Sequence, residues 1–131
     1  SITKIINQLM ENYETSELEA KDSSNELSKD LWKTYSAFAN TSGGIILLGV
    51  SQHKITHKFS ITGVKSAEKL VAEIYTIAQN KNKVSLNLLD NQDVQIHNIN
   101  GTKIISIYYL WCCYRSFCFI IYIYYCSCFY I

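Results

Sequence analysis

The chain has 131 residues, of which 48% are hydrophobic and 18% are charged. This length suits one domain of ordinary size, and this composition allows a packed core and excludes wholesale disorder. Twelve Lys and Arg side chains against eleven Asp and Glu give a formal net charge of +1. Net charge alone therefore indicates no class of partner.

The composition changes abruptly near the C-terminus. Residues 104–131 hold one charged side chain, Arg115, and residues 111–131 use only seven residue types, mostly Tyr, Ile, Cys and Phe. We therefore expect a domain over residues 1–108 and an aberrant apolar tail over residues 109–131. The uninterrupted apolar run from Ser116 has 16 residues, whereas a spanning helix needs about 20. A frameshifted reading frame, a membrane tail anchor and a buried strand pair are the three open explanations of the tail.

All five cysteines lie after residue 111. They form no C-x-x-C pair and have no histidine nearby, which argues against a zinc site. Five is an odd number, and no signal peptide precedes the chain, which argues against a secreted disulfide framework. We expect a reduced, cytoplasmic protein without firm membrane association.

Periodic apolar residues predict three helices. The first opens the chain around residues 5–10. The second is capped by Ser24 or Asn25 and ends at the glycines Gly43 and Gly44, where glycine can adopt the left-handed conformation that ends helices. The third is capped by Ser66.

Alternating and continuous apolar runs predict six strands, over residues 17–21, 45–50, 59–64, 84–89, 94–99 and 103–108. The charged alternation in 17–21 is typical of an edge strand, and the apolar run 45–50 of a central buried strand. An Asn100-Gly101 turn joins the last two strands. The fold class is therefore α+β, with a mixed or antiparallel sheet of about five to six strands and three helices.

Three carboxylates precede Lys21, namely Glu14, Glu17 and Glu19. Clustered carboxylates can hold a divalent metal for phosphodiester cleavage. Glu14 and Glu19 are five residues apart, so they share a face only if the chain breaks between helix and strand after Glu14. The alternative is a solvated strand edge whose charges resist pairing.

Basic residues gather in the second part of the chain, because residues 31–103 hold eight lysines and four acids. A surface that attracts phosphates could comprise Lys54, Lys58, Lys65, Lys69, Lys81 and Lys83. Scattered surface lysines are the alternative explanation. His53 and His57 flank an expected loop and lack a third ligand, so we interpret them as exposed polar residues.

The string from Ala37 to Gly44 contains Asn40, Thr41 and two glycines. Backbone amides of such a turn can receive phosphate oxygens. A helix stop with tight packing is the alternative, because the turn leads from a helix to a strand.

Three strings together resemble the Schlafen AlbA-type domain. The segment 14–21 is similar to its E-x-x-x-x-E-x-K element, the segment 35–44 to its S-A-F-A-N-T-x-G-G helix stop, and the segment 46–50 to its G-V strand end. Ile61–Val64 also resembles the family's next segment. The resemblance covers about residues 8–108.

The resemblance implies an α+β domain that binds DNA or RNA, usually at the N-terminus of a longer bacterial ATP-binding protein or transcriptional regulator. Some animal members are RNA endonucleases that use two glutamates and an aspartate. The glutamates correspond to Glu14 and Glu19, with Lys21 beside them. The aspartate position falls near Ser51 or Gln52, neither of which is acidic.

The leading hypothesis is a nucleic-acid-binding domain without catalytic activity. Its contacts would come from Asn40, Thr41, Gly43, Gly44, Lys54, Lys58, Lys65 and Lys69. The first alternative is an RNA endonuclease that uses Glu14, Glu19 and Lys21, with Mg²⁺ or Mn²⁺ held by the two glutamates; no other cofactor is expected. The second is an interaction module or a nonfunctional fragment. A homodimer is left open.

Overall fold

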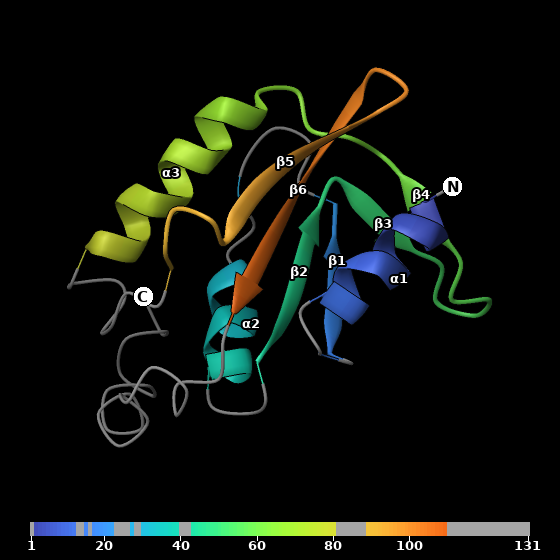
Figure 1. The fold of residues 1–131 in the computed structure, drawn as a ribbon, viewed down its shortest axis with the longest axis horizontal. Helices are drawn as coiled ribbons and strands as arrows, with labels where there is room; N and C mark the ends of the chain where they lie inside the picture. The colour runs from blue at the N-terminus through green and yellow to red at the C-terminus, as the bar shows by residue number, and fades with distance from the viewer. Residues whose placement is uncertain are drawn as a thin grey trace.

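The computed structural model describes residues 2–12, 15, 17–22, 27, 30–39, 43–80 and 89–109. Most of the expected strand 84–89 and nearly all of the tail lie outside these residues. The elements in chain order are α1 (Ile2–Asn12), β1 (Leu18–Lys21), α2 (Asp30–Ala39), β2 (Gly44–Leu48), β3 (Val50–Gln52), β4 (Phe59–Ile61), α3 (Ala67–Gln79), β5 (Val94–Ile99) and β6 (Thr102–Tyr109) (Figure 1).

A mixed four-stranded sheet, in the order β1-β2-β6-β5, forms the centre of the fold. β1 runs parallel to β2, while β6 is antiparallel to both β2 and β5. α2 and α3 cover one face of this sheet, and α1 covers the other, together with the small β3–β4 hairpin. The predicted α+β class, the three helices and the mixed sheet are confirmed.

β2 lies between two hydrophobic layers, and all five of its residues are buried. Ile46 and Leu48 pack in the cluster formed with α2 and α3, whereas Ile45 and Leu47 pack in the cluster formed with α1. A strand that is covered on both faces needs apolar side chains at every position. The continuous apolar run therefore correctly predicted the central strand.

The predicted strand 45–50 is interrupted at Gly49, which adopts a left-handed φ of 84°. Leu48 packs toward α2 and α3, but Val50, two residues later, packs toward α1. An unbroken strand would place both residues on the same face. The prediction of one strand is therefore wrong at Gly49, where the chain turns over and begins the β3–β4 hairpin.

Backbone hydrogen bonds hold this break closed. The Gly49 oxygen accepts hydrogen bonds from the amides of Thr62 (2.9 Å) and Gly63 (2.8 Å), and the Gly49 amide donates to the Lys21 oxygen (2.9 Å). A Cβ atom on Gly49 would lie 2.9 Å from the carbonyl carbon of Gly63. Gly49 therefore joins β1, β2 and the end of β4 where no side chain fits.

The structure confirms one predicted boundary between elements and corrects another. Asn100 and Gly101 have φ angles of 53° and 86°, which confirms the hairpin turn between β5 and β6. Ser66 occupies the N-cap of α3, but its side chain makes no capping hydrogen bond, so the expectation of a side-chain cap is wrong. Ser24 and Asn25 lie outside the described residues. Within the described part of the chain, no helix has the length and apolar character needed to cross a membrane.

One polar pair sits in the face that α1 covers. Ser106 of β6 is only 3% exposed, and its Oγ lies 2.8 Å from Nε2 of His97 on β5. The half-buried His97 ring has its pKa lowered below the ordinary value, because burial penalises the charged form. Sequence patterns did not single out this pair, since both residues lie in ordinary alternating strands.

We expect Gly49→Ala to lower the free energy of unfolding by about 2–4 kcal/mol, since it adds a backbone clash to an unfavourable φ. Gly101→Ala is the matched control, because Gly101 has a similar φ of 86° but no atom within 4 Å of an added Cβ. It should cost only about 1 kcal/mol. Urea unfolding followed by circular dichroism measures both, and equal losses would contradict the close approach at Gly49.

The lowered pKa of His97 predicts lower stability in acid. Around and below pH 6.5, the ordinary pKa of histidine, the unfolded chain binds a proton at this ring more readily than the folded chain does. The free energy of unfolding therefore falls as the pH drops through 6.5, and this loss levels off below the folded pKa. His97→Gln should remove this part of the pH dependence, whereas the exposed control His57→Gln should retain it. An unchanged pH profile in His97→Gln would refute the assignment.

Candidate nucleic-acid interface

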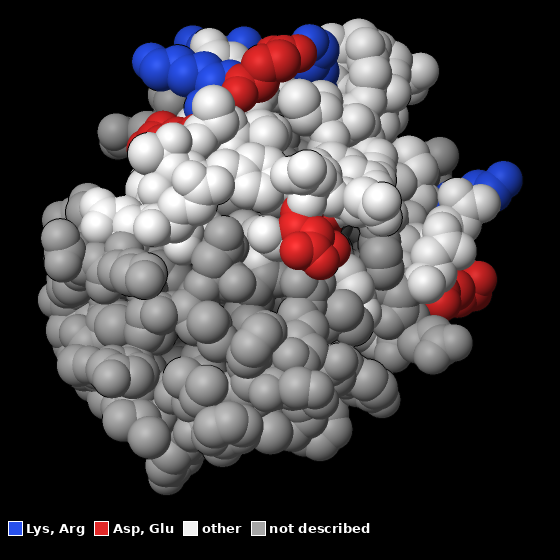
Figure 2. Space-filling model, turned by 60° about the vertical axis from the view of Figure 1, so that its left-hand side comes forward, with Lys and Arg blue, Asp and Glu red and all other residues white. Residues whose placement is uncertain are grey.

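Two lysines flank the start of α3. Lys65 precedes the N-cap Ser66, Lys69 lies in the first helical turn, and both side chains are exposed. Lys103 of β6 lies beside them, because the Val64 amide donates to the Lys103 oxygen at 2.9 Å. Figure 1 shows the start of α3 and the β5–β6 turn at the same end of the molecule, where Figure 2 shows basic side chains gathered with acidic ones among them.

Of the three lysines at this end, only Lys103 forms an ion pair with a described carboxylate. Lys103 Nζ donates to Glu68 Oε1 at 2.9 Å, and this hydrogen bond holds the pKa of Glu68 below its usual value. The other salt bridge found among the described residues joins Lys33 to Asp30. Lys65 and Lys69 therefore keep a positive charge that no described carboxylate neutralises directly.

A shallow hollow of about 350 Å³ lies between these lysines and the β5–β6 turn. It is lined by Thr62, Gly63, Val64, Lys65, Gly101, Thr102 and Lys103. The amides of the first turn of α3 lack a side-chain cap from Ser66, although the Glu68 carboxylate accepts a hydrogen bond from the Glu68 amide. The other amides of this turn and the positive end of the helix dipole attract anions. We call Lys65, Lys69, Lys103 and these amides the α3 surface.

The other two predicted lysines lie elsewhere. Lys54 and Lys58 are exposed in the loop that joins β3 to β4. β4 and the segment 62–64 separate them in the chain from the α3 surface. The four lysines therefore form two groups, one on the loop and one at the start of α3. Lys81 and Lys83 lie outside the described residues.

The glycines of the helix stop are buried in packing. Gly43 has a φ of 84°, and its amide donates to the Phe38 oxygen at 3.1 Å. A Cβ atom on Gly44 would lie 2.7 Å from the Phe38 ring. These contacts account for both glycines as a tight helix stop. Asn40 and Thr41 lie outside the described residues, so a phosphate contact by this string stays a prediction.

Glu19 and Lys21 share one face of the edge strand β1. Their register partners in β2 are Ile46 and Leu48, which pack toward α2 and α3. Glu19 is exposed and Lys21 is half-buried, while Glu14 lies outside the described residues. The described residues contain no group of three His, Cys, Asp or Glu side chains that could hold a metal. The described residues therefore do not by themselves form the metal site of a nuclease.

Sequence reasoning missed the organising role of His53 in the β3–β4 loop. Its Nδ1 accepts hydrogen bonds from the amides of Ile55 (3.2 Å) and Thr56 (3.1 Å). The only signal was the spacing of His53 and His57, which indicated a loop but no interaction. The ring is therefore a structural part of the loop as well as an exposed polar group.

Comparisons with known proteins agree with the fold and with the strings that suggested a family. The fold is similar to that of the N-terminal domain of a putative ATP-dependent DNA helicase RecG-related protein from Nitrosomonas europaea, which was solved by solution NMR. The TM-score is 0.58 and the sequence identity is 20%. The match covers 80% of this chain and 71% of that chain. No curated protein matches the chain. The model of the family described as Schlafen, AlbA_2 matches residues 14–114. This match covers most of the chain and contains all the described sheet strands and both helices α2 and α3, so the chain belongs to the Schlafen AlbA_2 family.

Proposed function

We propose that this domain binds DNA or RNA without cleaving it, as the N-terminal module of a larger bacterial regulator or ATP-binding protein. The observation that supports this proposal best is a long segment without acidic residues: no Asp or Glu occurs from Leu31 to Ala67. Lys54, Lys58 and Lys65 are exposed within it. A polyanion can approach Lys54 and Lys58 without repulsion from a carboxylate of this segment, and Glu68, which follows Lys65 in the chain, is paired with Lys103.

The α3 surface gives this charge a geometry suited to phosphate. Lysines act as point charges toward phosphate oxygens, and uncapped amides at a helix start add directed donors. A protein with the same fold carries a name that relates it to a DNA helicase, and family membership supports nucleic acid as the ligand. Because such contacts are made to the backbone, they position the domain without selecting a sequence.

We expect the full chain to bind labelled structured RNA or duplex DNA, with an affinity that falls steeply as salt rises. The double variant Lys65→Ala/Lys69→Ala should bind more weakly, and its slope of log K against log salt should shrink by about 1.8 for duplex DNA if both lysines contact phosphates. Fluorescence anisotropy at several salt concentrations measures both effects.

Lys4→Ala is the control, because Lys4 lies on α1, at the opposite face of the sheet from α3. It should leave the slope unchanged. Absent binding, or binding that does not respond to salt, would overturn the proposal. A loss in Lys4→Ala as large as in the double variant would move the binding surface away from α3.

Cleavage is the alternative function, and the shared face of Glu19 and Lys21 is the observation that favours it. A gel of the same samples, with and without Mn²⁺, reports on it. Metal-dependent cuts that disappear in Glu19→Gln would establish a nuclease and overturn the non-catalytic proposal. Intact nucleic acid in every lane supports binding alone.

A homodimer belongs to the same proposal, with β5 as its contact. β5 is the last strand of the described sheet. Since the Tyr108 amide donates to the Asp93 oxygen, the antiparallel alternation directs the backbone groups of Gln95, His97 and Ile99 toward β6. Those of Val94, Ile96 and Asn98 point outward. β5 carries no charged side chain, although charges are a usual protection of sheet edges.

Two copies can pair antiparallel through these outward groups about a twofold axis. We expect a dimer that Ile96→Lys converts to a monomer, because a lysine on the edge opposes pairing. Ile96→Thr, which keeps β propensity without a charge, should leave the dimer intact. Light scattering after size exclusion measures the mass, and a monomeric parent chain would exclude this contact.

A further inference from the structure

The loop between β3 and β4, residues 53–58, has a fixed shape although it contains neither glycine nor proline. The His53 amide donates to the Lys58 oxygen, and the His57 amide donates to the His53 oxygen, both at 2.9 Å. Together with the two bonds to His53 Nδ1, these contacts tie both ends and the middle of the loop to one residue. Gln52 Nε2 adds a bond to the His57 oxygen at 3.2 Å. We call this segment the hairpin loop.

This fixed loop holds an apolar side chain in water. Ile55 is 82% exposed, and the other large hydrophobic residue found exposed in the described part of the chain, Ile96, is only 37% exposed. A single exposed isoleucine is ordinary. Here, however, backbone and side-chain hydrogen bonds hold the loop around it, and His57 adopts a left-handed φ of 58°, a conformation that histidine tolerates better than most other non-glycine residues.

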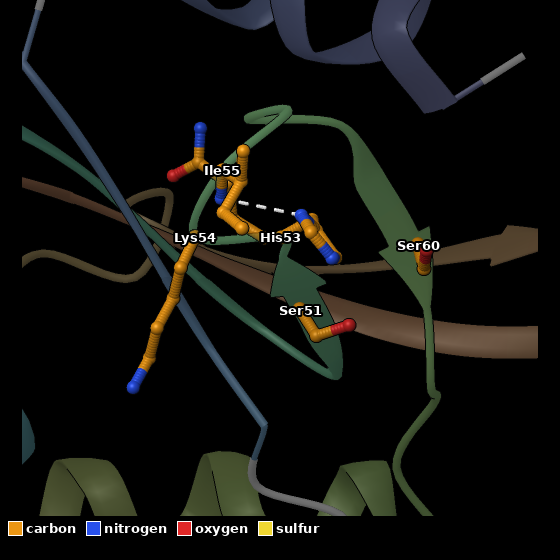
Figure 3. Close-up of a pocket in the computed structure, with 6 residues that line it drawn as sticks. Ser51, His53, Lys54, Ile55 and Ser60 are labelled. Atoms are coloured by element: carbon orange, nitrogen blue, oxygen red, sulfur yellow. Dashed lines mark hydrogen bonds between the residues drawn. The ribbon is translucent and has the colours of Figure 1, made fainter.

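Two lysines flank the apolar tip in the chain. Lys54 precedes Ile55, Lys58 closes the loop, and both are exposed. Figure 3 shows the Lys54 side chain extending away from Ile55 and from the two serines. The lysines of the loop can therefore bind a polyanion while the Ile55 side chain contacts an apolar group of the same ligand.

A hollow of about 520 Å³ adjoins the tip. It is lined by Ser51, Gln52, His53, Lys54, Ile55 and Ser60. Ser51 and Ser60 are register partners on β3 and β4, and they face away from α1, because their neighbours Val50, Phe59 and Ile61 pack toward it. Since Nδ1 of His53 accepts the loop amides, the neutral ring carries its hydrogen on Nε2 and can donate it.

One short hairpin thus carries an apolar side chain, two hydroxyl groups, a ring N–H donor and two lysines. A lipid would place its acyl chain on the apolar tip and its anionic headgroup on the cations, and its binding does not require the hydroxyls or the ring donor. A nucleotide with an unstacked base presents an apolar base face and a polar base edge, with a backbone phosphate on each side.

We propose that the hairpin loop binds an unstacked base, with Ile55 against its face, Ser51, Ser60 and His53 at its polar edge, and Lys54 and Lys58 on the adjoining phosphates. This inference rests on the proposed function and narrows its ligand to nucleic acid with unpaired bases. Apolar side chains at the tips of other nucleic-acid-binding elements insert between bases in the same physical way. A fully paired duplex offers the loop phosphates but no base face.

The test uses the full chain and two labelled duplexes that are identical except for one bulged 2-aminopurine. We expect binding to the bulged duplex to be tighter by about fivefold, as partial burial of an exposed isoleucine side chain against a base would give, with a change in 2-aminopurine fluorescence. Ile55→Ser should abolish this preference and leave binding to the paired duplex unchanged. Ile55→Leu, which keeps an apolar tip, should retain it.

The outcomes separate this inference from the function on which it rests. Salt-dependent binding of both duplexes with equal affinity would overturn the loop assignment and leave the proposed function standing, as would a preference that survives Ile55→Ser. No binding to either duplex would remove both proposals. Binding to vesicles of anionic lipid that Ile55→Ser abolishes, without a bulge preference, would assign the loop to membranes instead.

Discussion

The close approach of two backbone segments at Gly49 is the constraint on which the two basic surfaces depend. Its oxygen accepts two amide hydrogen bonds from the segment that follows β4, and its own amide bonds back to β1. Because the segments meet without an intervening side chain, the chain leaves the central sheet there and makes a separate hairpin. The returning segment then bonds to Lys103 of β6 before α3 begins. One glycine therefore sets the position of the hairpin loop and of the α3 surface together.

Burial explains why the charges lie at these places. β2 is covered on both faces and β6 is largely buried, so lysines have no place in the middle of the sheet. They occur where the chain leaves the core, in the hairpin loop, before α3 and next to the β5–β6 turn. The acid-free segment spans the buried strand and both exits from it. Exposed lysines thus gather where the chain leaves the core, although the net charge of the chain is only +1.

The sequence predicted the features that follow from burial of apolar residues, but it did not predict those that depend on local backbone geometry. β5 was predicted with its observed bounds, because Val94–Ile99 alternates and ends in an Asn-Gly turn. The break at Gly49 was missed, since apolar residues stand on both sides of it and the sequence does not state which face each one takes. His53 was placed in a loop, but its bonds to Ile55 and Thr56 depend on a ring orientation that no spacing encodes. His97 and Ser106 meet through strand register, which likewise appears only once the sheet is assembled.

The fixed junction also limits how far apart the two surfaces can be. Lys58 and Lys65 are seven residues apart, so their Cα atoms lie within about 25 Å of each other even along a fully extended chain. One strand of a duplex spans that length with about seven phosphates, at 3.4 Å each. A short stretch of nucleic acid can therefore contact the hairpin loop and the α3 surface at once. Contacts on one rigid body reinforce each other through effective concentration, so weak lysine contacts at α3 would hold the strand long enough for the loop to meet an unstacked base.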